Sequence, residues 1–359
     1  MIVFNSFWIL VSLFVIYTEA KSIEIDENDA WEEFKKEYNK QYSTESEDQQ
    51  RKATFEENSK LIKEHNEQNH QFRLKMNQFG DLTHEEFIRY LSFTPATPTN
   101  QNDSDGDSTD DALLLDNTYP KAIDLRKTGC VSEVKNQGDR PNKISWAFSV
   151  AGAIEGQVFK TEGKCLQHPV QSLSELFLID CQNENGVGTE FDKALELVRQ
   201  RGIYTEELYK LVKKLDVKCP EENYPIRASV LFEVLTIKEA TVGRMIKEIY
   251  GHENSVPATV DASHQSFQFY HTGVYNEQKC DIENQVANQA VLIVGYDETD
   301  SNAKHWLVKN SWGKSWGEAG YMKIAYGTCG IEKEAYIVTS AKCSCGSMKA
   351  SCHIKGILE

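Results

Sequence analysis

Hydrophobic residues recur with different periodicities in different parts of the chain. Near the N-terminus Trp31, Phe34 and Tyr38 recur at the spacing of one helical face. A continuous apolar stretch at residues 145–159 predicts a buried helix, and residues 172–175 have a capping-box-like pattern that begins another. Alternating apolar and polar positions at residues 290–296, 305–309 and 320–325 predict strands. The pattern therefore predicts helices early in the chain and strands late.

A second stripe at helical spacing lies within residues 47–66. Its members are three or four residues apart, which puts them along one face of a helix. An ordinary amphipathic helix would account for the spacing but not for the mixture of charged, amide and apolar side chains. The members of the stripe are Glu47, Arg51, Phe55, Asn58, Ile62 and Asn66.

Residues 95–118 differ in composition from the sequence on either side. Thr, Pro, Asn, Ser and Asp dominate, which predicts a solvated acidic linker. A calcium-binding loop is the alternative, but Gly106 is misplaced for one and the closing glutamate is absent. Asn102 begins a glycosylation sequon, which suits an exposed linker in a secreted protein.

Composition and charge exclude several classes of protein. The chain has 359 residues, 40% hydrophobic and 26% charged, which is typical of a globular protein. Its net charge of −16 argues against nucleic-acid binding, which needs a basic face. The apolar run Phe7–Tyr17 is too short to span a bilayer, and small residues up to Ala20 suit cleavage. We therefore predict a signal peptide at residues 1–20 and a soluble mature protein, secreted or in a lysosome-like or vacuole-like lumen.

All nine cysteines lie from Cys130 onward. In an oxidising compartment this predicts disulfides, and the odd number leaves one thiol over or paired between chains. Cys343 and Cys345 form a Cys-x-Cys pair that could suggest a metal, but no well-placed partner set accompanies it. We predict no metal and no cofactor.

The helical stripe at 47–66 resembles the interspersed motif of cathepsin L-type propeptides. Asn77, Phe79 and Asp81 resemble the second motif of those prodomains, with Lys75 in place of its leading glycine. The resemblance implies an inhibitory prodomain at residues 21–94. It also implies that the junction at 95–118 is where a mature enzyme would be released.

Residues 136–149 resemble the active-site helix of papain-like cysteine peptidases. Gln137-Gly138 and the run Trp146–Ser149 match, whereas both cysteines and the glycine between them are missing and the spacer is two residues longer. The resemblance covers about residues 27–340. It implies an α+β fold of two subdomains, one helical and one antiparallel and barrel-like, at residues 119–340. Residues 341–359 form a cysteine-containing tail beyond the family's usual end.

The resemblance also assigns the catalytic positions. Ser145 occupies the nucleophile position and Gln289 the base position, while Asn310 matches the amide that orients the base and Gln137 the oxyanion-hole amide. A serine hydroxyl does not ionise as a thiol does and needs a general base. An amide side chain cannot accept a proton at any useful pH. His305 is the nearest alternative base in sequence, but it corresponds to a packing position.

The peptide-binding groove implied by the resemblance keeps some of the family's residues and departs from others. Gly188 and Thr189 stand where the family has a glycine pair that binds an extended peptide. Phe191 aligns near an apolar specificity pocket, and Trp312, with Trp316, matches the indoles that shield Asn310. We expect a groove that survives with an altered preference.

The resemblance implies two disulfides, Cys181 with Cys219 and Cys280 with Cys329. Both ends of a third family bridge are missing, one within Asp139–Lys143 and the other at Gly186. Loss of both ends together favours real divergence. The pairing of the remaining cysteines stays open: Cys130, Cys165, Cys343, Cys345 and Cys352.

These observations favour a secreted papain-like homologue that lacks the catalytic cysteine and histidine, is proteolytically inactive and acts by binding. Expected partners are a peptide or protein ligand in the groove, a protease, the chain's own prodomain and cystatin-like inhibitors. Nucleic acid and membrane are not expected partners. Two alternatives remain, a hydrolase that uses Ser145 with an unorthodox base, and a structural or storage protein on the same fold.

Overall fold

The computed structural model describes residues 27–91, 119–138, 144–161, 172–182, 190–214, 219, 229–238, 241–280 and 287–344. The predicted signal peptide, the whole acidic linker and residues 345–359 of the tail lie outside these ranges. The chain divides into two compact units, Met1–Asp48 and Gln49–Glu359.

The first unit is built on helix α1 (Glu27–Glu37). Trp31 and Phe34 are buried, and the Trp31 ring stacks on Phe34 and Tyr42 at centroid distances of 5.5 and 5.7 Å. Helix α2 (Glu45–Glu67) begins here with a reciprocal cap. Thr44 Oγ1 accepts a hydrogen bond from the Glu47 N–H, and the Glu47 carboxylate accepts one from the N–H of Ser43. The helical spacing predicted for this segment is confirmed.

The second unit begins with the rest of α2, strand β1 (Phe72–Leu74) and helix α3 (His84–Leu91), and residues 49–91 are called the prosegment. The amide stripe of α2 binds backbone groups. Buried Asn58 donates to the carbonyls of Gly80 and Leu82 at 2.9 and 3.1 Å. Asn66 both donates to Leu74 O and accepts from Leu74 N. The mixed stripe therefore holds the following strand and turn against the helix, which apolar residues at the same spacing could not do.

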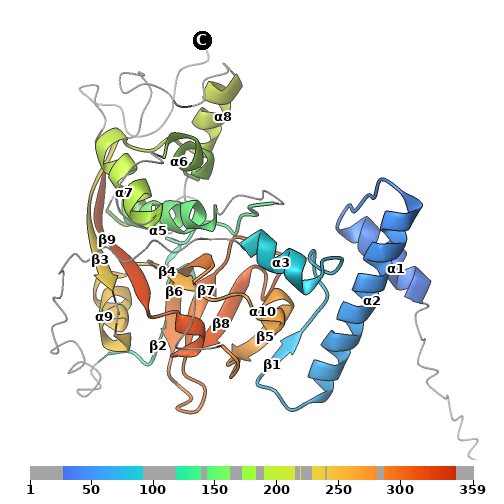
Figure 1. The fold of residues 1–359 in the computed structure, drawn as a ribbon. Helices are drawn as coiled ribbons and strands as arrows, with labels where there is room; N and C mark the ends of the chain where they lie inside the picture. Colours follow the sequence, from blue (N-terminus) through green and yellow to red (C-terminus); the bar gives the residue numbers. More distant parts are fainter. Residues whose placement is uncertain are drawn as a thin grey trace, which may run out of the picture. The chain divides into compact units, whose positions relative to one another are not determined.

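Nine strands of the described residues form one sheet in the order β1-β5-β8-β7-β6-β4-β9-β3, with β2 paired to β6 (Figure 1). The pairings are antiparallel except for β5 with β8, which is parallel and departs from the expected all-antiparallel arrangement. The strands after β1 are β2 (Ala122–Asp124), β3 (Ser229–Lys238), β4 (Val256–Val260), β5 (Tyr270–Tyr275), β6 (Gln289–Asp297), β7 (His305–Lys309), β8 (Tyr321–Ala325) and β9 (Glu334–Ser344).

Helices gather at one side of this sheet, where α5 to α8 form the helical half of the unit (Figure 1). An apolar cluster fills that half and includes Trp146, Phe177 and Tyr204. A second cluster fills the sheet half and includes Phe267, Trp306 and Trp316. The remaining helices are η1 (Leu125–Thr128), α5 (Ser145–Thr161), α6 (Glu175–Cys181), α7 (Glu190–Arg201), α8 (Glu206–Lys214), α9 (Val242–His252), α10 (Gln265–Gln268) and η2 (Thr328–Gly330).

The predicted elements agree with the structure at most boundaries. The apolar helix starts at Ser145 as expected and continues to Thr161. Ser174 caps α6 by accepting from the Phe177 N–H, which confirms the predicted helix start. The three predicted strands are β6, β7 and β8. Strand β9 continues to Ser344, beyond the boundary that the sequence placed at residue 340.

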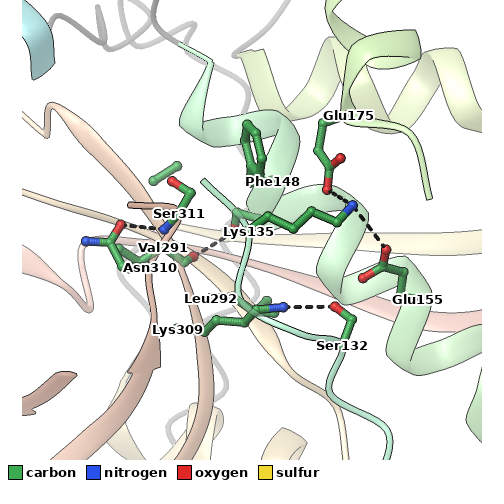
Figure 2. Close-up of a pocket in the computed structure, with 12 residues that line it drawn as sticks. Ser132, Lys135, Phe148, Glu155, Glu175, Val291, Leu292, Lys309, Asn310 and Ser311 are labelled. Carbon is green, nitrogen blue, oxygen red and sulfur yellow. Dashed lines mark hydrogen bonds and ion pairs between the residues drawn. The ribbon is translucent and has the colours of Figure 1, made fainter. Parts of the chain in front are cut away.

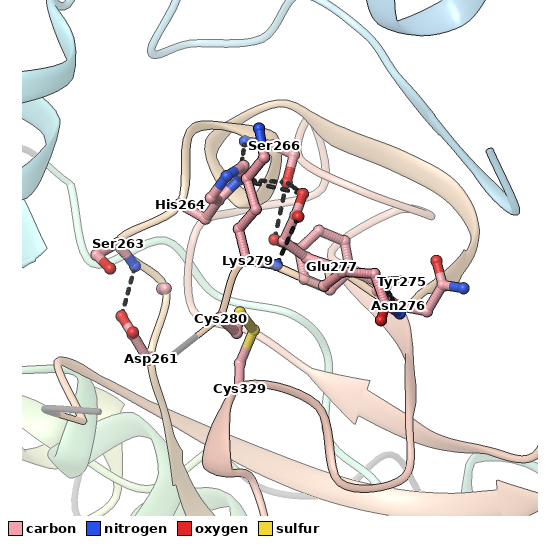
Figure 3. The surroundings of a disulfide bond; sticks show 12 residues. Asp261, Ser263, His264, Ser266, Tyr275, Asn276, Glu277, Lys279, Cys280 and Cys329 are labelled. Atoms are coloured by element: carbon pink, nitrogen blue, oxygen red, sulfur yellow. Dashed lines mark hydrogen bonds and ion pairs between the residues drawn. A yellow bond between two sulfur atoms is a disulfide. The ribbon is translucent and has the colours of Figure 1, made fainter. Parts of the chain in front are cut away.

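Two disulfides join described residues, Cys181–Cys219 and Cys280–Cys329, and they are the two pairs that the resemblance implies. The first ties α6 to the segment after α8, and the second, shown in Figure 3, ties the chain after β5 to η2. Cys130 is also disulfide-bonded. The Cys181–Cys219 and Cys280–Cys329 bridges close long loops, which lowers the conformational entropy of the unfolded chain.

Candidate active site

Ser145 is the first residue of α5 and is 2% exposed. Its Oγ accepts a hydrogen bond from the backbone N–H of Ala290 at 3.0 Å. The hydroxyl thus lies between the N-terminus of the central helix and the start of β6. This is the meeting point of the helical half and the sheet half, where the resemblance placed a nucleophile.

Gln289 opens strand β6 and is 1% exposed. Its Nε2 donates to Asn310 Oδ1 at 2.9 Å. Asn310 follows β7, and the antiparallel pairing of β6 with β7 brings the two amides together although they are far apart in sequence. The structure therefore places Gln289 in the position from which a base would contact an orienting asparagine.

Ser311 connects these amides to Gln137. The Ser311 hydroxyl donates to Gln137 Oε1 at 2.6 Å and accepts from Gln289 Nε2 at 3.4 Å. Gln137 is also held through its backbone N–H, which donates to Ser311 O at 2.8 Å. The four predicted catalytic positions are thus brought into one site, with Ser311 at its centre. Sequence reasoning did not single out Ser311, although it directly follows Asn310.

Among the described residues, the five side chains of this site are two hydroxyls and three primary amides, and none of them is ionisable. A cysteine–histidine site works as a thiolate beside an imidazolium, stabilised by the helix dipole. Here neither charge can form between about pH 4 and pH 9 because serine, glutamine and asparagine do not titrate in that range. These five side chains can hold a polar group by hydrogen bonds.

A charged cluster lies beside the site, in a small pocket between α5 and strands β6 and β7 (Figure 2). Lys135 Nζ is 2.5 Å from Glu175 and 3.8 Å from Glu155. Lys309 Nζ donates to Ser132 Oγ at 2.8 Å. Lys135 thus pairs with glutamates of α5 and α6, while Lys309 of β7 is held by a hydrogen bond to the segment that carries Lys135.

Burial is the main cause of the pKa shifts of Lys309 and Glu175 in this cluster. It lowers the pKa of Lys309 and raises the pKa of Glu175 to about 7. At Lys135 burial opposes the charge, but Glu155 and Glu175 outweigh it and the pKa is raised. Lys135 pairs with the acidic groups of the pocket and Lys309 with Ser132, whereas Ser145 and Gln289 bind Ala290, Asn310 and Ser311.

His305 is placed at the far end of β7 and cannot replace the missing base. It is buried and its Nδ1 lies 2.7 Å from Ala303 O. A strand rises about 3.3 Å per residue, so Lys309 at the other end is roughly 13 Å away. The interpretation of His305 as a packing residue agrees with this position.

The predicted groove residues behave differently from one another. Gly188 and Thr189 lie outside the described residues. Phe191 is fully buried and stacks on Tyr336 at 4.4 Å. This aromatic side chain lies in the apolar cluster of the helical half, and its expected place beside a groove stays a prediction.

Trp312 is fully buried rather than open to a groove. Rings of the prosegment pack on it, with Phe79 at 5.3 Å and Phe87 at 5.7 Å, both edge-on. Tyr90 is the third aromatic residue against it. The Trp312 surface is thus occupied by the chain's own N-terminal segment.

Three further hydrogen bonds fix the prosegment. Asn77 donates to Gln268 O at 2.7 Å, and Gln78 donates to Trp312 O at 2.7 Å. Tyr90 donates to Gly138 O at 3.2 Å, next to the oxyanion-hole position. These side chains bind backbone carbonyls, which have no signature of their own in a sequence.

Strand pairing completes the attachment. β1 runs antiparallel to β5, with Phe72 opposite Gly273. Gly273 has φ +92°, and a Cβ there would lie 2.3 Å from Gln71 O. Only glycine allows this approach, so Gly273 is a residue that sequence reasoning missed and that its place inside a strand could have indicated.

The described residues contain no group of three or more histidine, cysteine or acidic side chains that could hold a metal ion. None of the helices described is long and apolar enough to span a bilayer.

Comparison with known proteins identifies the two parts of the chain. Residues 119–339 match the papain family of cysteine proteases, and residues 31–87 match the cathepsin propeptide inhibitor domain. Cathepsin K of Mus musculus is 37% identical over 85% of this chain and 91% of its own length. Procathepsin L of Rattus norvegicus is 35% identical over 83% and 87%. Testin-2 of Mus musculus is 35% identical over 82% and 86%.

Solved structures agree with the fold. The digestive procathepsin L 3 of Tenebrio molitor larval midgut aligns with a TM-score of 0.69 at 28% identity, covering 87% of this chain and 99% of that one. A recombinant stem bromelain precursor aligns with a TM-score of 0.70 at 28% identity, covering 88% and 99%. The chain belongs to the papain family of cysteine peptidases and carries a cathepsin-type propeptide.

Proposed function

We propose that this protein is a proteolytically inactive papain-family member that acts by binding a peptide or protein. The observation that carries the proposal is the contact of Gln289 with Asn310. The amide nitrogen of Gln289 donates to Asn310 Oδ1 at 2.9 Å, which fills the base position with a group that takes up no proton. Ser145 at the nucleophile position has no thiol to ionise.

A hydrolase that uses Ser145 is the competing proposal. It would need a general base within hydrogen-bond reach of the hydroxyl. The hydrogen-bond partner of Ser145 Oγ is the backbone N–H of Ala290, which is a donor and not a base. The geometry therefore favours binding over hydrolysis. A structural or storage role remains the other alternative, and it predicts that no ligand enters the groove.

The prosegment supports a second part of the proposal. An inactive protein cannot remove its own prodomain, so the chain persists as a proform unless another protease cuts within residues 95–118. We propose residues 1–20 as signal peptide, 21–94 as prodomain, 119–340 as papain-like domain and 341–359 as tail. The disulfides support an oxidising compartment, either secreted or lysosome-like.

The test is a peptidase assay on the full chain cut within residues 95–118 by an added endopeptidase, with both fragments kept in the sample. We expect no turnover of fluorogenic Phe-Arg peptides after the added protease is inhibited, and no difference from Ser145→Ala. Turnover that disappears in Ser145→Ala would contradict the proposal and support the serine hydrolase. Shortening of the purified chain at acid pH without added protease would also contradict it.

Binding separates the first proposal from the structural alternative. We expect the cut protein to bind peptides or a cystatin-like inhibitor, measured by fluorescence anisotropy or calorimetry. Failure to bind any groove ligand would favour a structural or storage protein.

A further inference from the structure

Two glutamine side chains contact the hydroxyl of Ser311. Gln137 is reached by the Ser311 hydroxyl at 2.6 Å, and Gln289 reaches that hydroxyl at 3.4 Å. The Ser311 hydroxyl therefore makes a hydrogen bond with the amide group of each glutamine. The direction in which each amide faces decides what the site offers to a ligand.

The orientation of Gln289 follows from a backbone group. The N–H of Ser311 donates to Asn310 Oδ1 at 2.8 Å (Figure 2), which identifies that atom as the acceptor end of Asn310. Gln289 must present nitrogen to it, because two carbonyl oxygens in contact would repel. Both protons of Gln289 Nε2 are then used, one on Asn310 and one on Ser311. Its Oε1 points away from these partners.

Gln137 faces the other way. Ser311 has a single hydroxyl proton, which it donates to Gln137 Oε1. The Nε2 of Gln137 is therefore turned away from Ser311. No hydrogen bond within the described part of the chain involves this nitrogen or Gln289 Oε1, and neither is a fully enclosed orphan atom.

Ser145 supplies another donor. Its oxygen accepts from the Ala290 N–H, so its own hydroxyl proton is available. The site thus offers two donors, Gln137 Nε2 and the Ser145 hydroxyl, and one acceptor, Gln289 Oε1. This set is complementary to a peptide group, which has one carbonyl acceptor and one N–H donor.

We propose that the former catalytic centre binds an intact peptide bond of an extended ligand in its ground state. Gln137 and Ser145 bind the carbonyl oxygen, and Gln289 Oε1 accepts from the N–H. This inference rests on the proposed binding function and names its ligand as a peptide with an unsubstituted amide at this position. A peptidase must instead favour the transition state, in which the amide nitrogen receives a proton.

The proposal distinguishes ligands that differ by one atom. An ester in place of the amide lacks the N–H, and an N-methylated amide lacks it as well. A product peptide ending in a carboxylate at this position would set a negative oxygen against Gln289 Oε1. All three should bind more weakly than the intact amide because each leaves Gln289 Oε1 without a donor from the ligand or sets a negative oxygen against it.

The experiment compares a short N-acetylated, C-amidated peptide containing Phe-Arg-Ala with its ester analogue at the Arg–Ala link. Binding is measured on the full chain cut within residues 95–118, with both fragments present. The prosegment competes equally with both probes, so the ratio of the two dissociation constants is independent of it. We expect the amide to bind about tenfold more tightly than the ester, and mass spectrometry to recover both probes uncleaved.

Variants locate the effect at Gln289. Gln289→Met keeps the length of the side chain and removes the acceptor, so the amide-to-ester ratio should fall to about one. Gln200→Met, at the exposed end of α7, is the matched control and should keep the ratio. Because Gln289→Met could disturb Asn310, the N-methylated probe on unaltered protein is the second measurement and should match the ester.

The outcomes separate this inference from the proposed function. Binding of both probes with a ratio that is about one, or that Gln289→Met leaves unchanged, would overturn the inference and leave the binding function in place. Absence of binding, or cleavage of the amide that depends on Ser145, would overturn the proposed function and this inference with it. A high ratio that depends on Gln289 supports both.

Discussion

The catalytic centre and the prosegment-binding surface are held together by different kinds of contact. In the centre the key bonds join side chains to one another, as between Gln289 and Asn310. At the surface, side chains of the prosegment bind backbone carbonyls, as Asn77 binds Gln268 O. A centre of paired side chains changes its chemistry with one substitution, whereas a surface of backbone acceptors persists as long as the fold does.

The two regions also differ in titratable groups. The centre has none, because its hydroxyls and amides stay neutral. The prosegment surface carries several histidines, with His65 and His70 stacked at 4.1 Å on the prosegment and His264 on the sheet half. The comparison therefore predicts a centre whose own side chains do not titrate, with Glu175 as the titrating neighbour in the adjoining pocket, beside an attachment that responds directly to acid.

The largest expected effect comes from restoring the proton-transfer pair. In the linker-cut chain, Ser145→Cys with Gln289→His should hydrolyse Phe-Arg peptides at least about 10²-fold faster than either single variant, because each partner works only with the other. Fluorogenic peptide turnover measures this. Ser145→Cys with Gln200→His is the matched control and should stay inactive. A double variant as inactive as the control would mean that the centre differs from a working one in geometry as well as in residues.

The next largest effect concerns the close approach of β1 to β5. Gly273→Ala places a Cβ against Gln71 O and forces alanine to a φ of +92°. Strain of about 1–3 kcal/mol should loosen β1 and speed amide exchange at Lys75 and Val274 by about tenfold or more. Hydrogen exchange of the intact chain measures it.

The control for this substitution is Gly251→Ala in α9, where an added Cβ meets nothing within 4 Å. It should leave exchange at β1 unchanged. Equal protection of β1 in Gly273→Ala and in the unaltered chain would show that the strand pairing tolerates a side chain, and the surface would then depend less on its backbone than the comparison states.

Much of the fold could be predicted from the sequence because local pattern determines it. The apolar run from Ser145 predicted α5, and alternation predicted β6 to β8. The stripe containing Asn58 predicted the prosegment helix, since those residues bind a turn nearby in the chain. Such elements need only periodicity or a local partner.

The rest depends on contacts between distant residues. Gln268 contributes a backbone carbonyl, which any residue type possesses, so nothing in the sequence marks it. The role of Ser311 appears only when β6 and β7 pair. Phe191 is placed near a groove by alignment, and its stacking on Tyr336 appears only in the folded chain. The centre could be predicted by position, but its hydrogen-bond directions could not.

A smaller effect is expected from pH, because lowering the pH should weaken attachment of the prosegment. Burial lowers the pKa of His65, and stacked His70 and Arg73 lower it further, against the opposing effects of Phe72 O and Glu277. A lowered pKa in the attached state means that protonation favours release. The attachment is therefore at full strength above the ordinary histidine pKa and weakens as pH falls below it.

The pKa of His264, on the sheet half that receives the prosegment, is shifted in the same direction as that of His65. Burial lowers its pKa, with Lys279 and His84 adding to the effect and Glu277 and Asp261 opposing it. The Nδ1 of His264 lies 2.7 Å from Ser266 Oγ (Figure 3), a position that suits the neutral ring as an acceptor for the Ser266 N–H. Two histidines thus make attachment weaker in acid.

The measurement follows amide exchange at Lys75 between pH 7 and pH 5, corrected for the intrinsic pH dependence of exchange. We expect faster opening at lower pH and a flatter profile in His65→Gln. His252→Gln, exposed on α9, is the control and should keep the unaltered profile. Binding of the peptide amide at the centre, expressed as the amide-to-ester ratio, should not change over the same range. An acid-dependent ratio would remove the contrast between the two regions.

The smallest expected effect lies where the two regions meet. Tyr90 donates from α3 to Gly138 O, beside Gln137 of the centre. Tyr90→Phe keeps the ring on Trp312 and removes one hydrogen bond, for a cost of about 1 kcal/mol, or roughly fivefold faster exchange at Lys75. Tyr250→Phe, at an exposed site, should change nothing. If Tyr90→Phe loosens the prosegment but keeps the amide-to-ester ratio, attachment and peptide recognition are separate properties. If the ratio falls as well, Gly138 transmits the prosegment's position to Gln137, and the centre is coupled to the surface that covers it.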